Sequence, residues 1–307
     1  MNERKIILDT DMGIDDAVAV IVLLKLCKER IKTVFTSYGN TSLENATQNA
    51  LAMLSLAGAV NIPVVCGAEK PGPGNGVYED AGHIHGEDGL GGLRGVPPLS
   101  GLKLKEAIKG DYLQIIYDAI IEEDKIDYIA LGPLTNLSAL IKRFPDVLNK
   151  IDHAAVMGGG IGMGNVTEFA EFNFYCDAES ADHVLSVVPK LTLAELSLTT
   201  SVAFDLPRIA AVGEAGTVIS KVMEAALVYN YHQCVAYGEP GSTMHDSAAV
   251  IAYTHPELFE FKTCSIRVEC EKERYGESVL IQDGKNIRLA KKTDPDKILS
   301  VIAKNII

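Results

Sequence analysis

The sequence has few basic residues and no long apolar run. Its 307 residues include 28 lysines and arginines against 41 aspartates and glutamates, which gives a formal net charge of −13. Nucleic acids and anionic membranes attract clustered basic side chains, so neither is an expected partner. No uncharged apolar stretch approaches the roughly 20 residues that cross a bilayer. The apolar run after Lys5 is too short for the core of a signal peptide, so we expect a soluble, cytoplasmic protein.

Paired cysteines and several common catalytic motifs are also missing. The six cysteines include no C-x-x-C pair, which argues against a zinc ribbon or a dithiol redox site. Free thiols are typical of a reducing compartment. The chain contains no G-x-G-x-x-G motif, no Walker P-loop and no G-x-S-x-G elbow. These absences argue against a dinucleotide site, an NTP site and serine-nucleophile hydrolysis.

Short β-branched runs alternate with helix-like segments along the first half of the chain. Strands are predicted at residues 6–8, 33–36, 62–65, 128–131 and 154–157, and helices at 17–26, 43–56 and 134–141. Such alternation favours βαβ units and a mainly parallel sheet that is covered on both faces. Hydrophobic residues make up 47% of the chain, enough to form a core.

The last third continues without a linker rich in proline, glycine or serine. Helices are predicted over residues 217–235, after His245, and from residue 294, with a strand at 264–268. We therefore predict one domain over residues 1–307. Its class is α/β, with a mainly parallel, doubly wound (Rossmann-like) sheet and the active site at the C-terminal strand ends.

Four carboxylates lie within eight residues after the first predicted strand. They are Asp9, Asp11, Asp15 and Asp16. This is the position at which open α/β sheets bind ligands. Because like charges so close together repel, the cluster favours a bound cation. Ligands that are all oxygens suit a hard ion such as Ca²⁺ or Mg²⁺ rather than zinc or iron.

Other interpretations of this segment stay open. Asp15 or Asp16 can simply cap the following helix in a solvated turn. An EF-hand does not fit, because Ile14 and Val20 occupy the positions of its glycine and final glutamate. A haloacid-dehalogenase-type, Mg²⁺-dependent phosphohydrolase fits better, since it has Asp-x-Asp after its first strand.

Three further segments carry polar side chains of unusual type. They are residues 80–89 with His83 and His85, residues 158–173 with Asn165, Glu171 and Asn173, and the pair His245-Asp246. Each alone is explained by a polar loop or a helix cap. Together with the aspartates they offer carboxylates for a cation, amides for a polyhydroxylated ligand and histidines for proton donation. This set indicates metal-assisted hydrolysis of a small polar substrate.

The motifs together resemble the inosine-uridine-preferring nucleoside hydrolase family over nearly the whole chain. The first segment is similar to the family signature D-x-D-P-G-x-D-D-A, with Met12 in place of proline. The other motifs, in the family's order, are Gly39-Asn40, Gly82-His83-Ile84-His85-Gly86, Gly132-Pro133-Leu134-Thr135-Asn136, Met157-Gly158-Gly159, Glu171-Phe172-Asn173 and His245-Asp246. The resemblance implies hydrolysis of ribonucleosides to free base and ribose, for nucleoside salvage.

The resemblance also implies a Ca²⁺ site. Asp11, Asp16 and Asp246 would bind the ion through their side chains, and Leu131 through its backbone carbonyl. Asp11 would also act as general base toward the attacking water. Asp9 would support the loop.

The remaining roles concern the substrate. By resemblance, the ribose contacts are Asp15, Asn40, Asn165, Glu171 and Asn173, the base contacts are Tyr229, Gln233 and Tyr237, and the proton donors to the base are His245 and His83. The mixed base contacts favour pyrimidine nucleosides (uridine, cytidine), with inosine also accepted. Relatives form homodimers or homotetramers, which we expect here. The alternative outside enzymes is a nucleoside- or calcium-binding protein without turnover.

Overall fold

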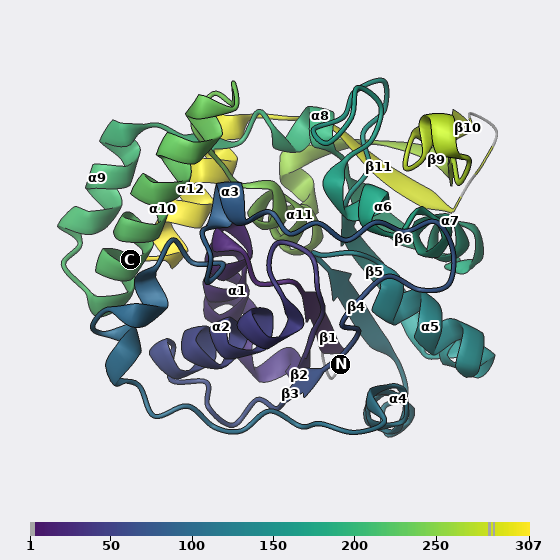
Figure 1. Ribbon diagram of the computed structural model, residues 1–307, viewed down its shortest axis with the longest axis horizontal. Coiled ribbons are helices and arrows are strands. Elements are labelled where there is room, and N and C mark those ends of the chain that lie inside the picture. Colours follow the sequence, from purple (N-terminus) through teal and green to yellow (C-terminus); the bar gives the residue numbers. More distant parts are fainter. Residues whose placement is uncertain (1–3, 282–283, 285) are drawn as a thin grey trace.

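A nine-stranded sheet forms the centre of the computed structural model, which describes residues 4–281, 284 and 286–307 (Figure 1). The strand order is β10-β9-β11-β6-β5-β4-β1-β2-β3. The strands are β1 (Lys5–Thr10), β2 (Ile31–Thr36), β3 (Val64–Cys66), β4 (Ile126–Ala130), β5 (Ile151–Met157), β6 (Leu191–Ala194), β9 (Phe259–Val268), β10 (Ser278–Ile281) and β11 (Ile287–Thr293). A separate antiparallel pair joins β7 (Ala203–Phe204) to β8 (Ser242–Thr243).

The strand order places a crevice beside β1. Strands β3, β2, β1, β4, β5 and β6 are neighbours and parallel, β11 is parallel to β6, and β9 and β10 add an antiparallel edge. In a doubly wound sheet of this order, the connections from β1 and β4 leave in opposite directions, and ligands bind between them. The predicted fold class is confirmed: a mixed α/β domain with a large, mostly parallel sheet.

Helices cover both faces of the sheet, as the alternation of buried side chains requires. Ile6 and Leu8 of β1 belong to one core cluster and Ile7 belongs to the other. The first cluster includes residues of α1 (Ile14–Cys27), α2 (Leu43–Leu56), α9 (Leu206–Glu214), α10 (Val218–Ala236), α11 (His245–Thr254) and α12 (Pro295–Asn305), and the second includes residues of α4 (Tyr112–Ile121), α5 (Thr135–Arg143) and α7 (Ala178–Val187).

The long helices begin where the sequence provides capping side chains. Ser42 accepts the Asn45 backbone N–H at the start of α2, and Thr217 accepts that of Ser220 at the start of α10. Helix α1 is buried on every side from Ile14 to Leu24, which explains its uninterrupted apolar sequence. The predicted helix at 43–56 coincides with α2, whereas β6, β11 and α7 were not predicted.

Three short helices lie near the C-terminal strand ends. Residues 70–95 include α3 (Gly82–His85), while α6 (Phe172–Cys176) and α8 (Leu196–Thr199) follow β5 and β6. Among the described residues, none of the helices is both long enough and apolar enough to cross a membrane.

Candidate active site

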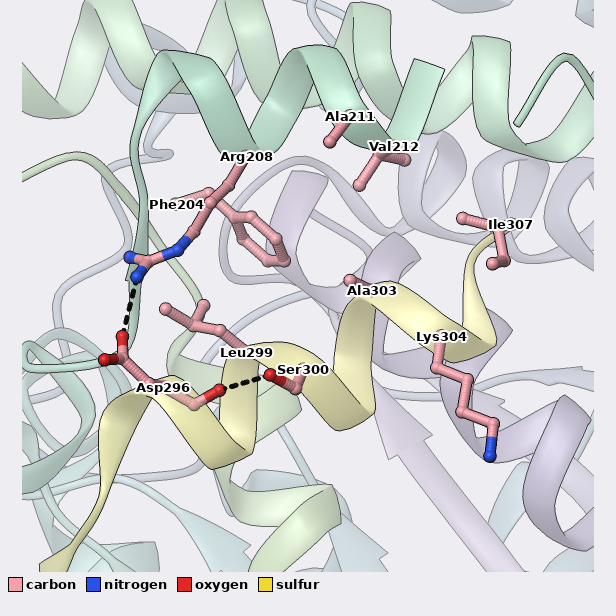
Figure 2. Close-up of a pocket in the computed structure, with 10 residues that line it drawn as sticks. All are labelled: Phe204, Arg208, Ala211, Val212, Asp296, Leu299, Ser300, Ala303, Lys304 and Ile307. Atoms are coloured by element: carbon pink, nitrogen blue, oxygen red, sulfur yellow. Dashed lines mark hydrogen bonds and ion pairs between the residues drawn. The ribbon is translucent and has the colours of Figure 1, made fainter. Parts of the chain in front are cut away.

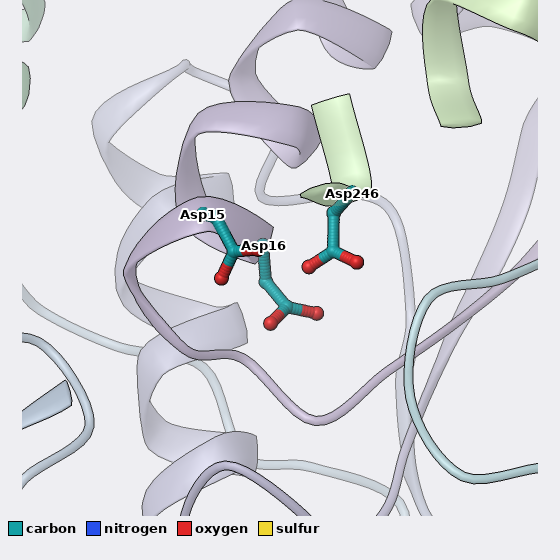
Figure 3. Close-up of side chains that lie close together, drawn as sticks. All are labelled: Asp15, Asp16 and Asp246. Atoms are coloured by element: carbon teal, nitrogen blue, oxygen red, sulfur yellow. The ribbon is translucent and has the colours of Figure 1, made fainter. Parts of the chain in front are cut away.

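Three carboxylates from two helices meet at the C-terminal end of β1 (Figure 3). Asp15 and Asp16 lie in the first turn of α1, and Asp246 lies in the first turn of α11. One oxygen of each side chain lies within 4.8 Å of those of the other two, and all three residues are buried. The structure thus brings together residues that are 230 positions apart in the chain.

The Asp16 carboxylate is fixed by hydrogen bonds on both oxygens. Its Oδ2 accepts the Gly13 backbone N–H at 2.8 Å and the Asn40 side-chain amide at 2.9 Å. Its Oδ1 accepts the Thr10 hydroxyl. Asp16 therefore closes the turn between β1 and α1 while it faces Asp15 and Asp246.

Asp11 lies beside this group in a tightly closed space. Its Oδ2 accepts the Asn40 backbone N–H at 2.6 Å, and its Oδ1 lies 3.3 Å from the Asn40 amide nitrogen. A Cβ added at Gly39 would lie 2.0 Å from Asp11 Oδ2, and one at Gly132 would lie 2.8 Å from Asp11 Cγ. Both positions need glycine because the backbone passes directly against the carboxylate.

Burial sets the electrostatics of the cluster. It raises the pKa of Asp15 to about 7 and raises the pKa of Asp11 and Asp246, and repulsion between neighbouring carboxylates adds to each increase. Asp15 Oδ1 is buried and has no hydrogen-bond partner among the described residues. An unpaired carboxylate oxygen among buried acids fits a hard cation, whose charge would favour the ionised forms.

The predicted backbone ligand lies at the same edge of the sheet. Leu131 follows the last residue of β4, and its N–H donates to the Asp9 carbonyl at 2.9 Å. Its own carbonyl accepts the side-chain amide of Asn173 at 2.7 Å. Asn173 thus orients this carbonyl at the crevice.

A cavity of about 360 Å³ opens at these carboxylates. The predicted residues that line it are Asp15, Asn40, His83, Leu131, Asn165, Glu171, Asn173, Tyr237, His245 and Asp246. Asp11 and Asp16 are fully buried and do not contribute to its lining. Asp9 lies elsewhere, because its carboxylate accepts hydrogen bonds from Tyr128 (2.8 Å) and Asn136 (2.9 Å).

Helix α10 presents a different face from the predicted one. Tyr237 lines the cavity, but Tyr229 and Gln233 lie outside the lining, where Asn230 and Cys234 appear instead. Tyr229 packs against the loop after α3, since a Cβ on Gly91 would lie 2.7 Å from its ring. One residue corresponds to about 100° around a helix, so this small shift changes the exposed face.

His85, which had no predicted role, also lines the cavity. Its Nδ1 accepts the Ile14 backbone N–H at 3.0 Å, one of the free amides in the first turn of α1. Burial lowers its pKa to about 4, so the ring is neutral at pH 7. The sequence feature that could have indicated this role is the second histidine of the Gly82-His83-Ile84-His85-Gly86 motif.

The two predicted proton donors both lie at the cavity. His245 Nδ1 lies 2.8 Å from the Thr199 hydroxyl, and burial, with a contribution from His85, lowers its pKa to about 4. The ring of His83 lies 5.0 Å from that of Tyr237, tilted by 59°. This aromatic pair joins α3 to the end of α10.

The segment after β5 forms the opposite wall. Glu171 caps α6, with Oε1 accepting the Asn173 N–H at 2.9 Å and Oε2 accepting the Gly159 N–H at 2.8 Å. Burial raises the pKa of this carboxyl. Asn165 Oδ1 accepts the Phe172 N–H at 2.9 Å. Backbone hydrogen bonds therefore fix all three predicted ribose contacts of this wall.

Comparison with known proteins identifies the family of this chain. The family model described as inosine-uridine preferring nucleoside hydrolase matches residues 6–300. The chain belongs to this family. It is 32% identical to uridine nucleosidase 1 of Arabidopsis thaliana, over 91% of this chain and 82% of that protein. It is also 32% identical to the pyrimidine-specific ribonucleoside hydrolase RihA of Escherichia coli O81 (strain ED1a), over 83% and 80%.

Solved nucleoside hydrolases share the fold. The plant nucleoside hydrolase PpNRh1 superposes with a TM-score of 0.87 at 29% identity, covering 99% of this chain and 98% of that one. A purine-preferring ribonucleoside hydrolase from Gardnerella vaginalis gives a TM-score of 0.89 at 22% identity, with the same coverage, and supports the fold alone. This nucleoside hydrolase is therefore an N-glycosidase enzyme.

A second depression, of about 430 Å³, lies between α9 and α12 (Figure 2). Arg208 pairs with Asp296 at 2.7 Å across it, and apolar side chains such as Phe204 and Leu299 form its floor. Its lining contains none of the predicted site residues, whereas the cavity at the aspartates contains most of them. We therefore assign the chemistry to the cavity at the aspartates.

Proposed function

We propose that this nucleoside hydrolase cleaves the N-glycosidic bond of ribonucleosides with the help of Ca²⁺. The observation that carries the proposal is the buried group Asp15, Asp16 and Asp246, which borders a cavity lined by amides and histidines. Family membership supports this activity over that of a phosphohydrolase. The names of these two relatives support a preference for pyrimidine nucleosides. The description of the family supports inosine as a further substrate.

The residues present fit a calcium ion. Asp11, Asp16, Asp246 and the Leu131 carbonyl would hold it, and the unpaired Asp15 oxygen shows that the site has unused acceptor capacity. When bound, the ion would supply positive charge and orient the water and the ribose hydroxyls. The carboxylates, the backbone carbonyl, the water and the hydroxyls are all oxygen ligands, which Ca²⁺ prefers.

The protein groups supply the rest of the chemistry. Asp11 accepts a proton from the attacking water, for which burial and the neighbouring Asp16 make its carboxylate more basic. Asp15 and Asn40 hold the ribose from one side, and Asn165, Glu171 and Asn173 from the other. Cleavage develops positive charge on the ribose, as in glycoside hydrolysis, and the carboxylates stabilise it.

The leaving base needs a proton. His83 and His245 are placed to provide it, since both rings lie at the cavity. Because burial lowers the pKa of His245 to about 4, this ring donates a proton only as negative charge develops on the leaving base beside it and raises that pKa. Thr199 holds Nδ1 of His245, which leaves Nε2 as the atom for the base. Tyr237, beside His83, forms the aromatic side of the same region.

The contact with the ribose diol provides the test of this proposal. Uridine and 2′-deoxyuridine differ by one hydroxyl, which the proposal assigns to the metal and to Asp15. We expect kcat/KM for 2′-deoxyuridine to be at least about a hundredfold lower, since a buried polar site left without its partner loses several kcal/mol. Comparable values for both nucleosides would reject the diol contact.

We extend the proposal to the whole protein. Residues 1–307 form one nucleoside hydrolase domain, which works in the cytoplasm as a homodimer or homotetramer. Its partner is a small-molecule ribonucleoside, and the formal net charge of −13 supports this over a nucleic acid or membrane. Sedimentation equilibrium checks the assembly, and a purely monomeric protein at micromolar concentration would contradict it.

A further inference from the structure

Glu195 is a fully buried carboxylate that the proposed reaction does not use. It follows the last residue of β6 and lies outside the lining of the active-site cavity. Its Oε1 accepts a hydrogen bond from Lys291 Nζ of β11 at 3.3 Å and another from the Ser197 hydroxyl. Its Oε2 accepts the backbone N–H groups of Ser197 at 2.9 Å and Ile161 at 3.4 Å. Because protein donors occupy both oxygens, we expect this carboxylate to orient the structure around it rather than to bind a ligand.

The structure that Glu195 orients is the single turn α8. Its side chain caps the start of the turn through the Ser197 N–H, and its backbone carbonyl accepts the Thr199 N–H at 3.1 Å. The Leu196 N–H donates to the Gly159 carbonyl at 2.8 Å, which joins the turn to the loop after β5. A single helical turn has little stability of its own, because its first hydrogen bond orders several residues at once. These contacts therefore hold Thr199 in place.

Thr199 connects this turn to the cavity. Its side chain is fully buried, and its Oγ1 lies 2.8 Å from Nδ1 of His245, a residue of the cavity lining. The same oxygen lies 3.4 Å from the Leu196 carbonyl, which is longer than an ordinary O–H···O hydrogen bond. The hydroxyl has one proton, so we assign it to the shorter contact, with Nδ1 as the acceptor. The neutral ring then carries its own proton on Nε2, the atom proposed for the base.

We propose that Glu195 is a positioning residue for His245 and acts through Thr199. The carboxylate fixes α8, and the Thr199 hydroxyl fixes the tautomer and the orientation of the ring. As a result, Nε2–H is directed at the leaving base as a hydrogen-bond donor, because the partner of one ring nitrogen decides which nitrogen carries the proton. The inference rests on the proposed hydrolysis of ribonucleosides and adds to it two residues that lie outside the cavity lining.

A leaving group that needs no hydrogen-bond donor separates this role from a general effect on the structure. The 4-nitrophenolate of 4-nitrophenyl β-D-ribofuranoside departs as a stable anion, whereas the uracil of uridine needs the donor. Both substrates carry the same ribose and use the same attacking water. The measurement is the ratio of kcat/KM for uridine to kcat/KM for the 4-nitrophenyl riboside, in the wild type and in each variant.

Thr199→Val removes the hydroxyl and keeps the branched shape of the side chain. We expect this variant to lower the ratio about tenfold, the effect of one hydrogen bond to the reacting base. Thr199→Ser retains the hydroxyl and should keep most of the wild-type ratio. If Thr199→Val lowers kcat/KM for both substrates by the same factor, the inference is wrong.

Glu195→Gln tests the more distant residue. Glutamine keeps the size of the side chain but offers one acceptor oxygen, so it cannot satisfy the donors of Lys291, Ser197 and Ile161 together. We expect the ratio to fall about threefold, less than in Thr199→Val, because the hydroxyl remains near the ring. Glu260→Gln is the matched control, since it removes an exposed ion pair with Lys292 and should leave the ratio unchanged.

The double variant of Thr199→Val and Glu195→Gln shows whether one residue acts through the other. We expect its ratio to equal that of Thr199→Val, because the hydroxyl that transmits the effect is already absent. A further decrease in the double variant would overturn the link between Glu195 and Thr199. If the wild type releases ribose from neither substrate, the proposed function fails, whereas release with the wild-type ratio in every variant contradicts this inference alone.

Discussion

Asn40 donates its side-chain amide to Asp16 Oδ2 at 2.9 Å, and its backbone N–H binds Asp11 Oδ2 at 2.6 Å. A single residue, Asn40 in the loop after β2, therefore positions two of the proposed metal ligands. This places Asn40 behind the carboxylates in addition to its proposed contact with ribose. Side chains that orient metal ligands in this way have large effects on affinity.

Asn40→Ala should weaken Ca²⁺ binding about 10- to 100-fold, because Asp16 loses the side-chain amide that orients it and Asp11 keeps only the backbone N–H of residue 40. Isothermal titration of the metal-free protein with Ca²⁺ measures this directly. Asn61→Ala is the control, since the Asn61 side chain accepts an exposed hydrogen bond from Lys105, away from the carboxylates. Unchanged affinity in Asn40→Ala would show that the amide does not orient the site.

Gly39→Ala should reduce kcat/KM for uridine by at least about a hundredfold. The new Cβ would lie 2.0 Å from Asp11 Oδ2, so the proposed general base must move. Gly58→Ala separates backbone strain from this displacement, since Gly58 has a φ of +62° and nothing within 4 Å. That control should lose about 1 kcal/mol of stability and no activity. Full activity in Gly39→Ala would contradict the tight packing around Asp11.

Protonation of His153 should lower the free energy of unfolding in acid. Burial lowers the pKa of His153 from 6.5 to about 4. Between pH 4 and pH 6.5, His153 is protonated in the unfolded chain but neutral in the folded chain. Stability is therefore complete above about pH 6.5 and falls as the pH drops toward 4, by roughly 3 kcal/mol for this group.

The measurement is urea unfolding of wild type and His153→Gln at pH 7 and pH 4. Glutamine does not titrate, so the wild type should lose roughly 3 kcal/mol more than the variant over this range. His232→Gln, at an exposed position of α10, is the matched control. Equal losses in wild type and His153→Gln would mean that burial does not suppress protonation of His153.

The sheet and the acidic site could be predicted because local patterns specify them. β-Branched runs before apolar helices gave most parallel strands, and the first carboxylate segment follows β1 as expected. Asp9 is the exception within that segment. It lies within the strand, where side chains alternate between faces, and its carboxylate bonds to Tyr128 and Asn136. Strand alternation puts Asp9 on the face opposite Thr10, whose hydroxyl donates to Asp16, so Asp9 points away from the carboxylate cluster.

Other features depend on tertiary packing that no local pattern contains. The rotation of α10 that selects Asn230 over Tyr229 is set by its packing against the loop after α3. His85 accepts an N–H from a helix that begins 71 residues earlier. Met12 has a φ of +45°, which a proline ring cannot adopt, so this turn differs from the one that the family signature implies.

The most direct test of the central claim is ribose release from uridine by wild type and by Asp11→Ala. Each is measured after EDTA treatment and again after Ca²⁺ is restored. We predict that the wild type releases ribose, stops with EDTA and recovers with Ca²⁺. Asp11→Ala should stay at least about a hundredfold slower than the Ca²⁺-loaded wild type under every condition, because it lacks the general base. Equal ribose release under every condition would contradict the calcium-dependent mechanism.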